Sequence, residues 1–508
     1  MTKISKIDNK WQFWVDRGGT FTDIIAKKPG GEIESIKLLS ENPKSYSDPI
    51  ERGIEKFFQK YKYLKSKIED IEVIKIGTTI GTNALLENKG SKTALVITEG
   101  FGDILKIGFQ NRPNLFDINI KIPDELYENV LEVDERILAD GSVKKGLNVV
   151  KIKNDLLKLF NDGINSLAIV FMHGYKYTQH EIKVAEIASK IGFNQISCSH
   201  VISSTIKIIN RGDTSVLDAY LSPIIYNYTS SLKSKFPKTK LMFMQSNGGL
   251  ADSKHFMGKN SILSGPAGGV IGAIITSKKA GINKIIGFDM GGTSTDVCHY
   301  NGIIERTFNS EISGVKMQTP MIALHTVAAG GGSILKFDGS RFRVGPDSAG
   351  ANPGPACYNK GGPLTLTDAN FILGKLQKEF FPSTFGTNSD SPVNLDIINE
   401  KFNDLSYQIE KLSGKKMSKE EIASGFIKIA IENMSNAIKK ISIEKGYNVK
   451  NYTLCCFGGA GGQHACLVAE ALGISTVFIH PLSGVLSALG IGNSNIKIIK
   501  EKTVELTL

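Results

Sequence analysis

A pattern of two glycines set among aspartates and threonines occurs twice in the chain, at 16–23 and at 289–296. Asp, Gly, Gly, Thr, Thr and Asp stand at the same places in both copies. Paired glycines allow a tight turn with positive φ, and their N–H groups can approach an anion closely. Threonine hydroxyls add donors, and the leading aspartate can hold Mg²⁺ through water. The repeat therefore predicts two phosphate-binding turns.

The residues that would bind phosphate come from both copies, and an arginine beside the first adds a fixed positive charge. They are Arg17, Gly18, Gly19, Thr20, Thr22, Gly291, Gly292, Thr293 and Thr295. A plain β-hairpin explains a single copy about equally well, because short glycine motifs are weak evidence. Two copies in one chain favour phosphate binding.

A third glycine-rich segment follows a predicted buried strand at 452–457 and precedes a predicted helix at 463–472. Without side chains, such a loop would let an adenosine lie against backbone at the start of the helix. Its residues are Gly458, Gly459, Ala460, Gly461 and Gly462. No Gly-x-x-x-x-Gly-Lys-Ser/Thr motif is present, so the sequence does not indicate a P-loop protein.

Strand-like and helical segments alternate along the chain, which is typical of α/β layers. Predicted strands flank both turns, at 11–15 and 22–26 and again at 285–288 and 297–300. A capping box at Ser418 and Glu421 begins a helix whose apolar stripe continues to a predicted end at Gly446. A length of 508 residues predicts two to four domains. We expect a first lobe over 1–210 with the first turn, and a second over 211–508 with the second turn and the adenosine loop.

Composition excludes several classes of protein. The net charge of +11 is mostly lysine spread evenly along the chain, so no nucleic-acid partner is expected. No apolar run reaches the roughly 20 residues of a membrane helix, and the N-terminus has no secretory h-region. The six cysteines show no metal-ligand spacing. We expect reduced thiols, a cytoplasmic location and no membrane contact.

Two phosphate hairpins followed by an adenosine loop resemble the actin, Hsp70 and sugar-kinase superfamily. The resemblance implies a two-lobed, ribonuclease H-like α/β fold with a nucleotide cleft between the lobes. The chain more closely resembles the hydantoinase A family, in its ATP-dependent 5-oxoprolinase branch. The segments that carry the resemblance run through nearly the whole chain and include VDRGGTFTDI, IGTTIGTNALLENKG, NRPNLFD, SGPAGGVIGA, FDMGGTSTDV, HTVAAGGGSI and GGAGGQHA.

This resemblance implies an A-type component that uses ATP and Mg²⁺ to phosphorylate the lactam of 5-oxo-L-proline, as in glutathione metabolism. A B-type hydrolytic subunit would complete the conversion to L-glutamate, so a hetero-oligomer is expected. Relatives usually continue beyond the point where this chain stops, and we expect their C-terminal region to be absent. The alternatives are a subunit of a related hydantoinase or ketone carboxylase (acetone or acetophenone type), or a non-catalytic actin-like ATPase regulator.

Phosphoryl transfer depends on positioning and charge neutralisation, and the aspartates of the two turns suit both needs. We expect Asp16 and Asp289 to be catalytic and to hold Mg²⁺. Asp296, or its counterpart Asp23, would orient an attacking group or a water. The alternative is that these aspartates only cap the hairpins through local backbone bonds.

Candidate substrate residues lie in other polar loops, and each has a structural alternative. Thr78, Thr79 and Asn83 follow a predicted strand, where simple helix N-capping is the alternative. Arg112 would pair with a carboxylate, or form a surface salt bridge. His325 precedes a possible anion nest at Gly331, Gly332 and Ser333, but a lone histidine is more often structural. Relatives commonly have an acidic residue just before His325, where this chain has Ala323-Leu324, which weakens the case for that position.

Overall fold

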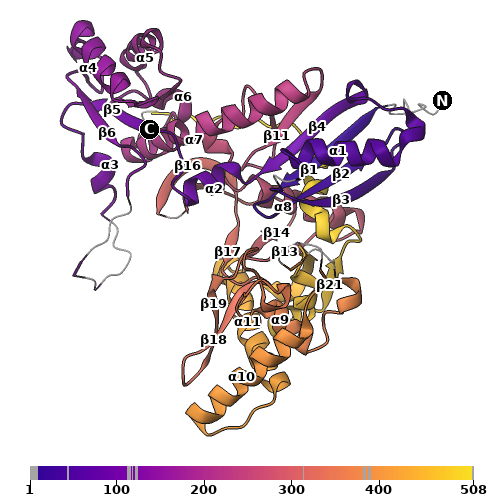
Figure 1. Ribbon diagram of the computed structural model, residues 1–508. Coiled ribbons are helices and arrows are strands. Elements are labelled where there is room, and N and C mark those ends of the chain that lie inside the picture. Colours follow the sequence, from indigo (N-terminus) through magenta and orange to yellow (C-terminus); the bar gives the residue numbers. More distant parts are fainter. Residues whose placement is uncertain are drawn as a thin grey trace. The chain divides into compact units, whose positions relative to one another are not determined.

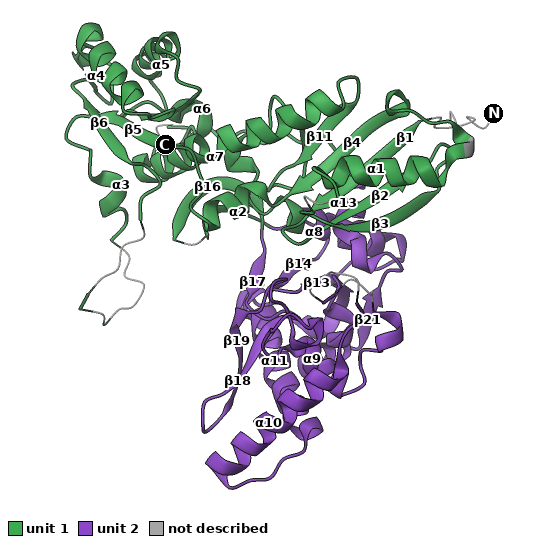
Figure 2. Cartoon of the chain, in the orientation of Figure 1, with its two compact units in different colours: residues 1–267, 306–322, 494–508 green, residues 268–305, 323–493 purple. Residues whose placement is uncertain are grey.

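A computed structural model describes residues 10–42, 45–110, 116, 118–119, 124–312, 314–381, 385–386 and 391–505. The chain forms two compact units (Figure 2). Unit 1 comprises Met1–Ala267, Arg306–Ile322 and Ser494–Leu508, and unit 2 comprises Gly268–Glu305 and Ala323–Asn493. The boundary predicted between the two lobes, after residue 210, falls within helix α7 (Ile208–Lys235) of unit 1. The division into lobes 1–210 and 211–508 stays a prediction.

The largest sheet of unit 1 has six strands in the order β12-β11-β4-β1-β2-β3 (Figure 1). Their bounds are β1 Trp11–Arg17, β2 Phe21–Lys27, β3 Ile33–Leu39, β4 Ile71–Thr78, β11 Lys240–Met244 and β12 Leu250–Asp252. The predicted hairpin at the first turn is confirmed, with both strands slightly longer than expected. Apolar side chains such as Phe13, Val15 and Ile24 are fully buried beneath helix α1 (Pro49–Lys60).

A second sheet of unit 1 is parallel throughout, in the order β10-β9-β5-β6. Its strands are β5 Thr93–Thr98, β6 Asn129–Val133, β9 Ser166–Val170 and β10 Gln195–Cys198. Helices α4 (Val149–Asn161) and α5 (Gln179–Ile191) share one core with it, while buried residues of α7 pack with the side chains of β5 and β9 in another. Shorter elements complete the unit: α2 Ile80–Leu86, α3 Ile104–Ile107, β7 Arg136–Ile137, β8 Val143–Lys145, α6 Ser199–Ile202, β15 Arg306–Ile312 and β16 Val315–Ile322.

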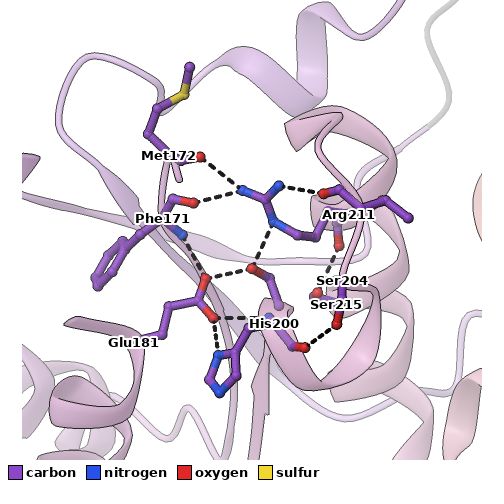
Figure 3. A network of polar contacts seen from close by, with 9 residues as sticks. Phe171, Met172, Glu181, His200, Ser204, Arg211 and Ser215 are labelled. Atoms are coloured by element: carbon purple, nitrogen blue, oxygen red, sulfur yellow. Dashed lines mark hydrogen bonds and ion pairs between the residues drawn. The ribbon is translucent and has the colours of Figure 1, made fainter. Parts of the chain in front are cut away.

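A buried network joins α5, α6 and α7 at the carboxyl end of β9 (Figure 3). The fully buried Arg211 donates to Phe171 O at 2.7 Å and to Ser199 Oγ at 2.9 Å. Ser199 Oγ in turn donates to Glu181 Oε1 at 2.5 Å. The other oxygen of Glu181 lies 2.6 Å from Nδ1 of His200. Because these charged groups are paired and bonded to backbone, we interpret the network as a structural brace.

Asp213, on α7, is expected to make the stability of unit 1 depend on pH. Burial raises the pKa of Asp213 to about 7, and Lys316 opposes the shift. The folded chain then holds a proton that the unfolded chain loses above its ordinary pKa of 3.8. Stability should therefore fall from about pH 4 to about pH 7.

Asp213→Asn should remove this part of the pH dependence and raise stability at pH 7.5 more than at pH 4. Urea unfolding of both proteins at the two pH values measures the difference. An equal effect of the substitution at both pH values would contradict the assignment of the titrating group.

Unit 2 is built on a five-stranded sheet in the order β17-β14-β13-β20-β21. Its strands are β13 Ile285–Met290, β14 Thr295–Tyr300, β17 His325–Val327, β20 Thr453–Phe457 and β21 Thr476–Ile479, and the hairpin of β18 Ser333–Phe337 and β19 Phe342–Ser348 lies apart. The helices are α8 Ser264–Lys279, most of which belongs to this unit, α9 Leu366–Ile372, α10 Leu395–Ser413, α11 Lys419–Ile441, α12 Ala465–Leu472 and α13 Leu486–Asn493. One large core is shared by α9, α10, α11 and the sheet.

The strongest sequence signals for unit 2 are confirmed, with one changed boundary. The capping box of Ser418 and Glu421 begins α11, and its apolar stripe faces the core. The helix ends at Ile441, earlier than expected, and Gly446 ends the short 3-10 turn that follows. In the part of the chain that the structure describes, no helix has both the length and the apolar character needed to cross a bilayer.

Candidate functional site

The first turn closes between β1 and β2, whose register places Asp16 opposite Asp23. Gly18 N donates to Phe21 O at 3.0 Å. Ser40, at the end of β3, braces the turn by donating from Oγ to Gly18 O at 2.6 Å and from N to Thr20 O at 2.8 Å. Its hydroxyl also lies 2.9 Å from that of the fully buried Thr22. The Thr22 side chain therefore points into the protein. The sequence did not identify Ser40 as a residue that supports this turn.

The second turn repeats this geometry between β13 and β14, with Asp289 opposite Asp296. Gly291 N donates to Ser294 O at 3.0 Å. The buried Thr295 donates its hydroxyl to Ala329 O, so it too faces inward. In the two copies the second threonine of the pattern therefore holds the turn to a neighbouring segment.

Three of the four turn glycines have no packing need that their neighbours explain, whereas a Cβ on Gly18 would stand 3.0 Å from Phe21 O. Gly18, Gly19, Gly291 and Gly292 all lack positive φ, so the expectation that they supply left-handed backbone is wrong. A Cβ on Gly292 would meet nothing within 4 Å, and one on Gly291 would meet nothing nearer than 3.8 Å. The space over these turns is open, which suits close approach of an anion to the backbone.

Three predicted substrate residues lie beside the first turn, because β4 runs parallel to β1 and pairs Thr78 with Arg17. Thr79 N donates to Arg17 O at 3.1 Å, and Asn83 Nδ2 lies 3.5 Å from Thr79 Oγ1. Thr79 occupies the N-cap of α2 but makes no side-chain capping bond, so the capping alternative is wrong for it. Thr78 is buried and its hydroxyl accepts from Ile80 N at 3.2 Å.

Two further residues near the first turn have partners within unit 1. The guanidinium of Arg17 lies 5.3 Å from the ring centre of Tyr228, an attractive cation–π geometry. Gly265, at the start of α8, lies so close to Asp16 that a Cβ there would stand 2.9 Å from Oδ1. After Ser40, Gly265 is thus the second residue beside the first turn that the sequence did not predict there.

The second aspartate of each turn has a different partner in each copy. Asp23 forms an ion pair with Lys37, and burial raises its pKa while Lys37 opposes the shift. Asp296 accepts from Thr326 Oγ1 at 2.5 Å, and burial raises its pKa against that hydrogen bond. Among the residues that the structure describes, no Lys or Arg forms an ion pair with Asp296, which distinguishes it from Asp23 as a group that can accept a proton.

The third glycine loop lies against the second turn within unit 2. Ala460 N donates to Met290 O at 2.9 Å. Gly458 has φ +83°, and a Cβ on it would overlap Asp289 Oδ1 and stand 2.5 Å from Met290 O. The predicted adenosine loop and the predicted Mg²⁺ ligand of this unit are therefore neighbours, and Gly458 is required by both its conformation and its contact.

Gly458→Ala should displace Asp289 and lower nucleotide affinity by roughly tenfold or more, because strained backbone and a clash coincide. Gly146→Ala is the control, since a Cβ at Gly146 meets nothing within 4 Å, its φ is not positive, and it lies outside the glycine loops. Isothermal titration with ATP measures both variants. Equal affinity of the two variants would contradict the role given to Gly458.

A fourth glycine run also belongs to the second turn. Gly331 N donates to Gly291 O at 3.0 Å, and Gly332 N donates to Gly292 O at 2.6 Å. Ser333 is buried and its hydroxyl accepts from Gly330 N at 2.8 Å. The backbone of the predicted nest thus supports the second turn. The N–H groups of Gly331 and Gly332, which were predicted to bind substrate, are used in these hydrogen bonds.

Not all candidate residues are brought together. His325 pairs with Val297, so its side chain is on the sheet face opposite to the Asp296–Thr326 pair. Burial lowers the pKa of His325, and nearby Lys440 on α11 adds to the shift.

Arg112 lies outside the described residues. Thr20 and Thr293 stand exposed in their turns.

Within the described residues, no group of three or more His, Cys, Asp or Glu side chains forms a metal site. Mg²⁺ needs fewer protein ligands, because it keeps several waters and binds one or two carboxylates plus phosphate oxygens. Asp16 and Asp289, each at a strand end beside open glycine backbone, fit that kind of site.

Two family models match the sequence over most of its length. The family model "Hydantoinase/oxoprolinase N-terminal region" matches residues 12–192, and "Hydantoinase/oxoprolinase" matches residues 211–500. The 5-oxoprolinase 1 of Arabidopsis thaliana is 45% identical over 96% of this chain and 42% of its own length. The 5-oxoprolinase of Dictyostelium discoideum is 43% identical over 99% of this chain and 44% of its own length. The chain thus spans less than half the length of these relatives.

Among solved structures, the ATP-dependent caprolactamase from Pseudomonas jessenii superposes with a TM-score of 0.81 at 29% identity. The match covers 96% of this chain and 71% of the caprolactamase chain. The predicted α/β class and actin-like ATPase fold are confirmed, as is the family resemblance of the sequence motifs. The chain belongs to the hydantoinase/oxoprolinase family.

Proposed function

We propose that the chain binds ATP with Mg²⁺ through the Asp16 turn of unit 1 and the Asp289 turn and Gly458 loop of unit 2. The observation that carries this proposal is the repeated turn itself. In each copy an aspartate lies at a strand end beside glycine backbone that is free of close contacts, at Gly19 in the first turn and at Gly291 and Gly292 in the second. Backbone N–H groups in such turns suit phosphate oxygens, and the carboxylate suits water-bound Mg²⁺.

The reaction that we propose is the ATP-dependent activation of a cyclic amide, with 5-oxo-L-proline as substrate. Its lactam oxygen attacks the γ-phosphorus of ATP, a new O–P bond forms, and the bond to the β-phosphate oxygen breaks to release ADP. Water then adds to the activated carbon, and the ring C–N bond opens as the nitrogen takes a proton, which gives an acyl phosphate. A second water attacks the same carbon, and phosphate leaves with the former lactam oxygen, so that both oxygens of the new side-chain carboxylate of glutamate come from water. The 5-oxoprolinases at 43–45% identity and the ATP-dependent caprolactamase support this substrate class.

The chain's own residues would position the reactants and balance charge. Asp16 and Asp289 would hold Mg²⁺, which would neutralise phosphate charge. Asp296, whose pKa is raised by burial, holds or moves a proton near the second turn. Thr79 and Asn83 would contact substrate beside the first turn.

A B-type hydrolytic subunit is the proposed partner for the water-dependent half of the reaction. A relative from Pseudomonas jessenii that is 30% identical is named caprolactamase subunit alpha, which supports an arrangement of more than one subunit. We assign activation of the lactam to this chain and ring opening to that partner, in a cytoplasmic hetero-oligomer.

ATP hydrolysis tests the proposal when it is measured with 5-oxoproline, with hydantoins, and with acetone plus bicarbonate. Each substrate is tried with the chain alone and with a B-type subunit. We expect 5-oxoproline to stimulate turnover and to yield glutamate when the partner is present. Turnover indifferent to 5-oxoproline in both settings would contradict the lactam assignment, and stimulation by acetone plus bicarbonate would favour the carboxylase alternative.

A further inference from the structure

Helix α9 in unit 2 carries a run of polar residues whose side chains are buried. It spans only seven residues, Leu366–Ile372. Thr367, Asp368 and Asn370 are all less than 9% exposed. Burying so many polar groups costs free energy unless each is hydrogen-bonded, so their partners indicate what the helix holds in place.

Thr367 holds the glycine run that supports the second turn. Its backbone N donates to Gly331 O at 2.8 Å, and its hydroxyl donates to the same oxygen at 2.9 Å. Gly331 N in turn donates to Gly291 O. A chain of two hydrogen-bonded steps therefore links α9 to the second turn.

Asp368 holds a different segment, the loop that follows β19. Its carboxylate accepts from Ala356 N at 3.1 Å and from Cys357 N at 2.8 Å. It also accepts from Thr365, which begins the helix in a capping box. The carboxylate is thus occupied by the loop and by its own helix start.

Asn370 reaches the end of the third glycine loop. Its Nδ2 donates to Gln463 Oε1 at 2.9 Å and lies 3.1 Å from His464 Nε2. Burial lowers the pKa of the fully buried His464 to about 4, so the ring is neutral at physiological pH. A neutral ring accepts the Asn370 hydrogen bond at Nε2 in the tautomer that carries its proton on Nδ1.

We propose that Asn370 is a positioning residue for the nucleotide, which holds the third glycine loop in its binding geometry through Gln463 and His464. The inference rests on the proposed function, because it assumes that the loop binds adenosine. Asn370 lies nearly ninety positions before this loop in the sequence, and it does not contact either phosphate-binding turn directly. Thr367 shows that the same helix also fixes the second turn, so α9 sets both parts of the site in unit 2.

Asn370→Leu is the direct test, since it keeps the side-chain volume and removes the amide. It should raise the dissociation constant for ATP and for ADP about tenfold, because two hydrogen bonds to the loop are lost. Inorganic triphosphate, which has no adenosine, should bind as it does to the unchanged chain. A merely structural role would not separate these ligands.

Asn399→Leu is the matched control in the same unit. Asn399 on α10 donates to Leu395 O at 3.0 Å and accepts from Lys419 Nζ at 2.7 Å, away from the glycine loops. It should leave all three affinities unchanged. If Asn370→Leu does not fold, Gln463→Leu removes one acceptor at a half-buried position and should weaken ATP binding in the same direction.

Two results would overturn the inference alone: unchanged ATP affinity in Asn370→Leu, or equal losses for ATP and inorganic triphosphate. Both results are judged by comparison with the wild-type chain, which must itself bind ATP. Failure of the unchanged chain itself to bind ATP would overturn the proposed function, and this inference with it.

Discussion

Asp289→Asn is expected to lower ATP turnover by roughly a hundredfold or more. The substitution keeps the shape of the side chain but removes the charge that would hold Mg²⁺ at the second turn. The carboxylate of Asp289 lies directly against Gly458, so the lost charge belongs to the part of unit 2 that also holds the third glycine loop. Asp16→Asn should have an effect of similar size, because Asp16 holds the equivalent place in the first turn.

Steady-state hydrolysis at several Mg²⁺ concentrations measures this effect, and excess Mg²⁺ should restore part of the lost activity. Asp347→Asn is the matched control, since Asp347 is an exposed residue of unit 2 paired with Lys336. Its turnover should match that of the unchanged chain. Wild-type turnover in both Asp16→Asn and Asp289→Asn would contradict the assignment of the two turns to the nucleotide.

Arg211→Met is expected to lower the free energy of unfolding of unit 1 by about 3–5 kcal/mol. Arg211 donates to the carbonyl oxygens of Phe171, Met172, Thr205 and Ile206, and methionine leaves all four without this donor. It also removes a positive charge that interacts favourably with the buried Glu181. Urea unfolding followed by circular dichroism measures the loss.

A surface pair on the same helix as Glu181 supplies the control. Lys183 and Glu186 form an exposed ion pair, so Lys183→Met should change stability by less than about 1 kcal/mol. The double change Glu181→Gln with Arg211→Met should recover part of the stability, because no buried charge is then left unpaired. A loss below 1 kcal/mol in Arg211→Met would show that the network is not the brace that we infer.

The sequence predicted the elements that carry their own local signal. The two hairpins follow from a repeated pattern, and α11 follows from its capping box and apolar stripe. It did not predict which way the threonines of the turns face. Thr22 turns inward because β3 brings Ser40 against the first turn, and such a partner is set by strand pairing rather than by the motif.

Contacts between distant segments account for most of what was missed. Gly458 meets Asp289 because β20 pairs in parallel with β13, although the two strands are far apart in sequence. His325 was placed in the site by its neighbours in sequence, yet the two-residue period of β17 turns it to the other face of the sheet. The α9 and Arg211 networks left no signal in the sequence because single polar residues inside helices are ordinary.

Isotope transfer from the lactam oxygen tests the central claim most directly. 5-Oxoproline labelled with oxygen-18 at the ring carbonyl is incubated with ATP, Mg²⁺, this chain and a B-type subunit, and the released phosphate is analysed by mass spectrometry. If the lactam oxygen attacks ATP, the label is expected in inorganic phosphate in step with glutamate formation. Glutamate that forms while the phosphate stays unlabelled would contradict phosphorylation of the lactam.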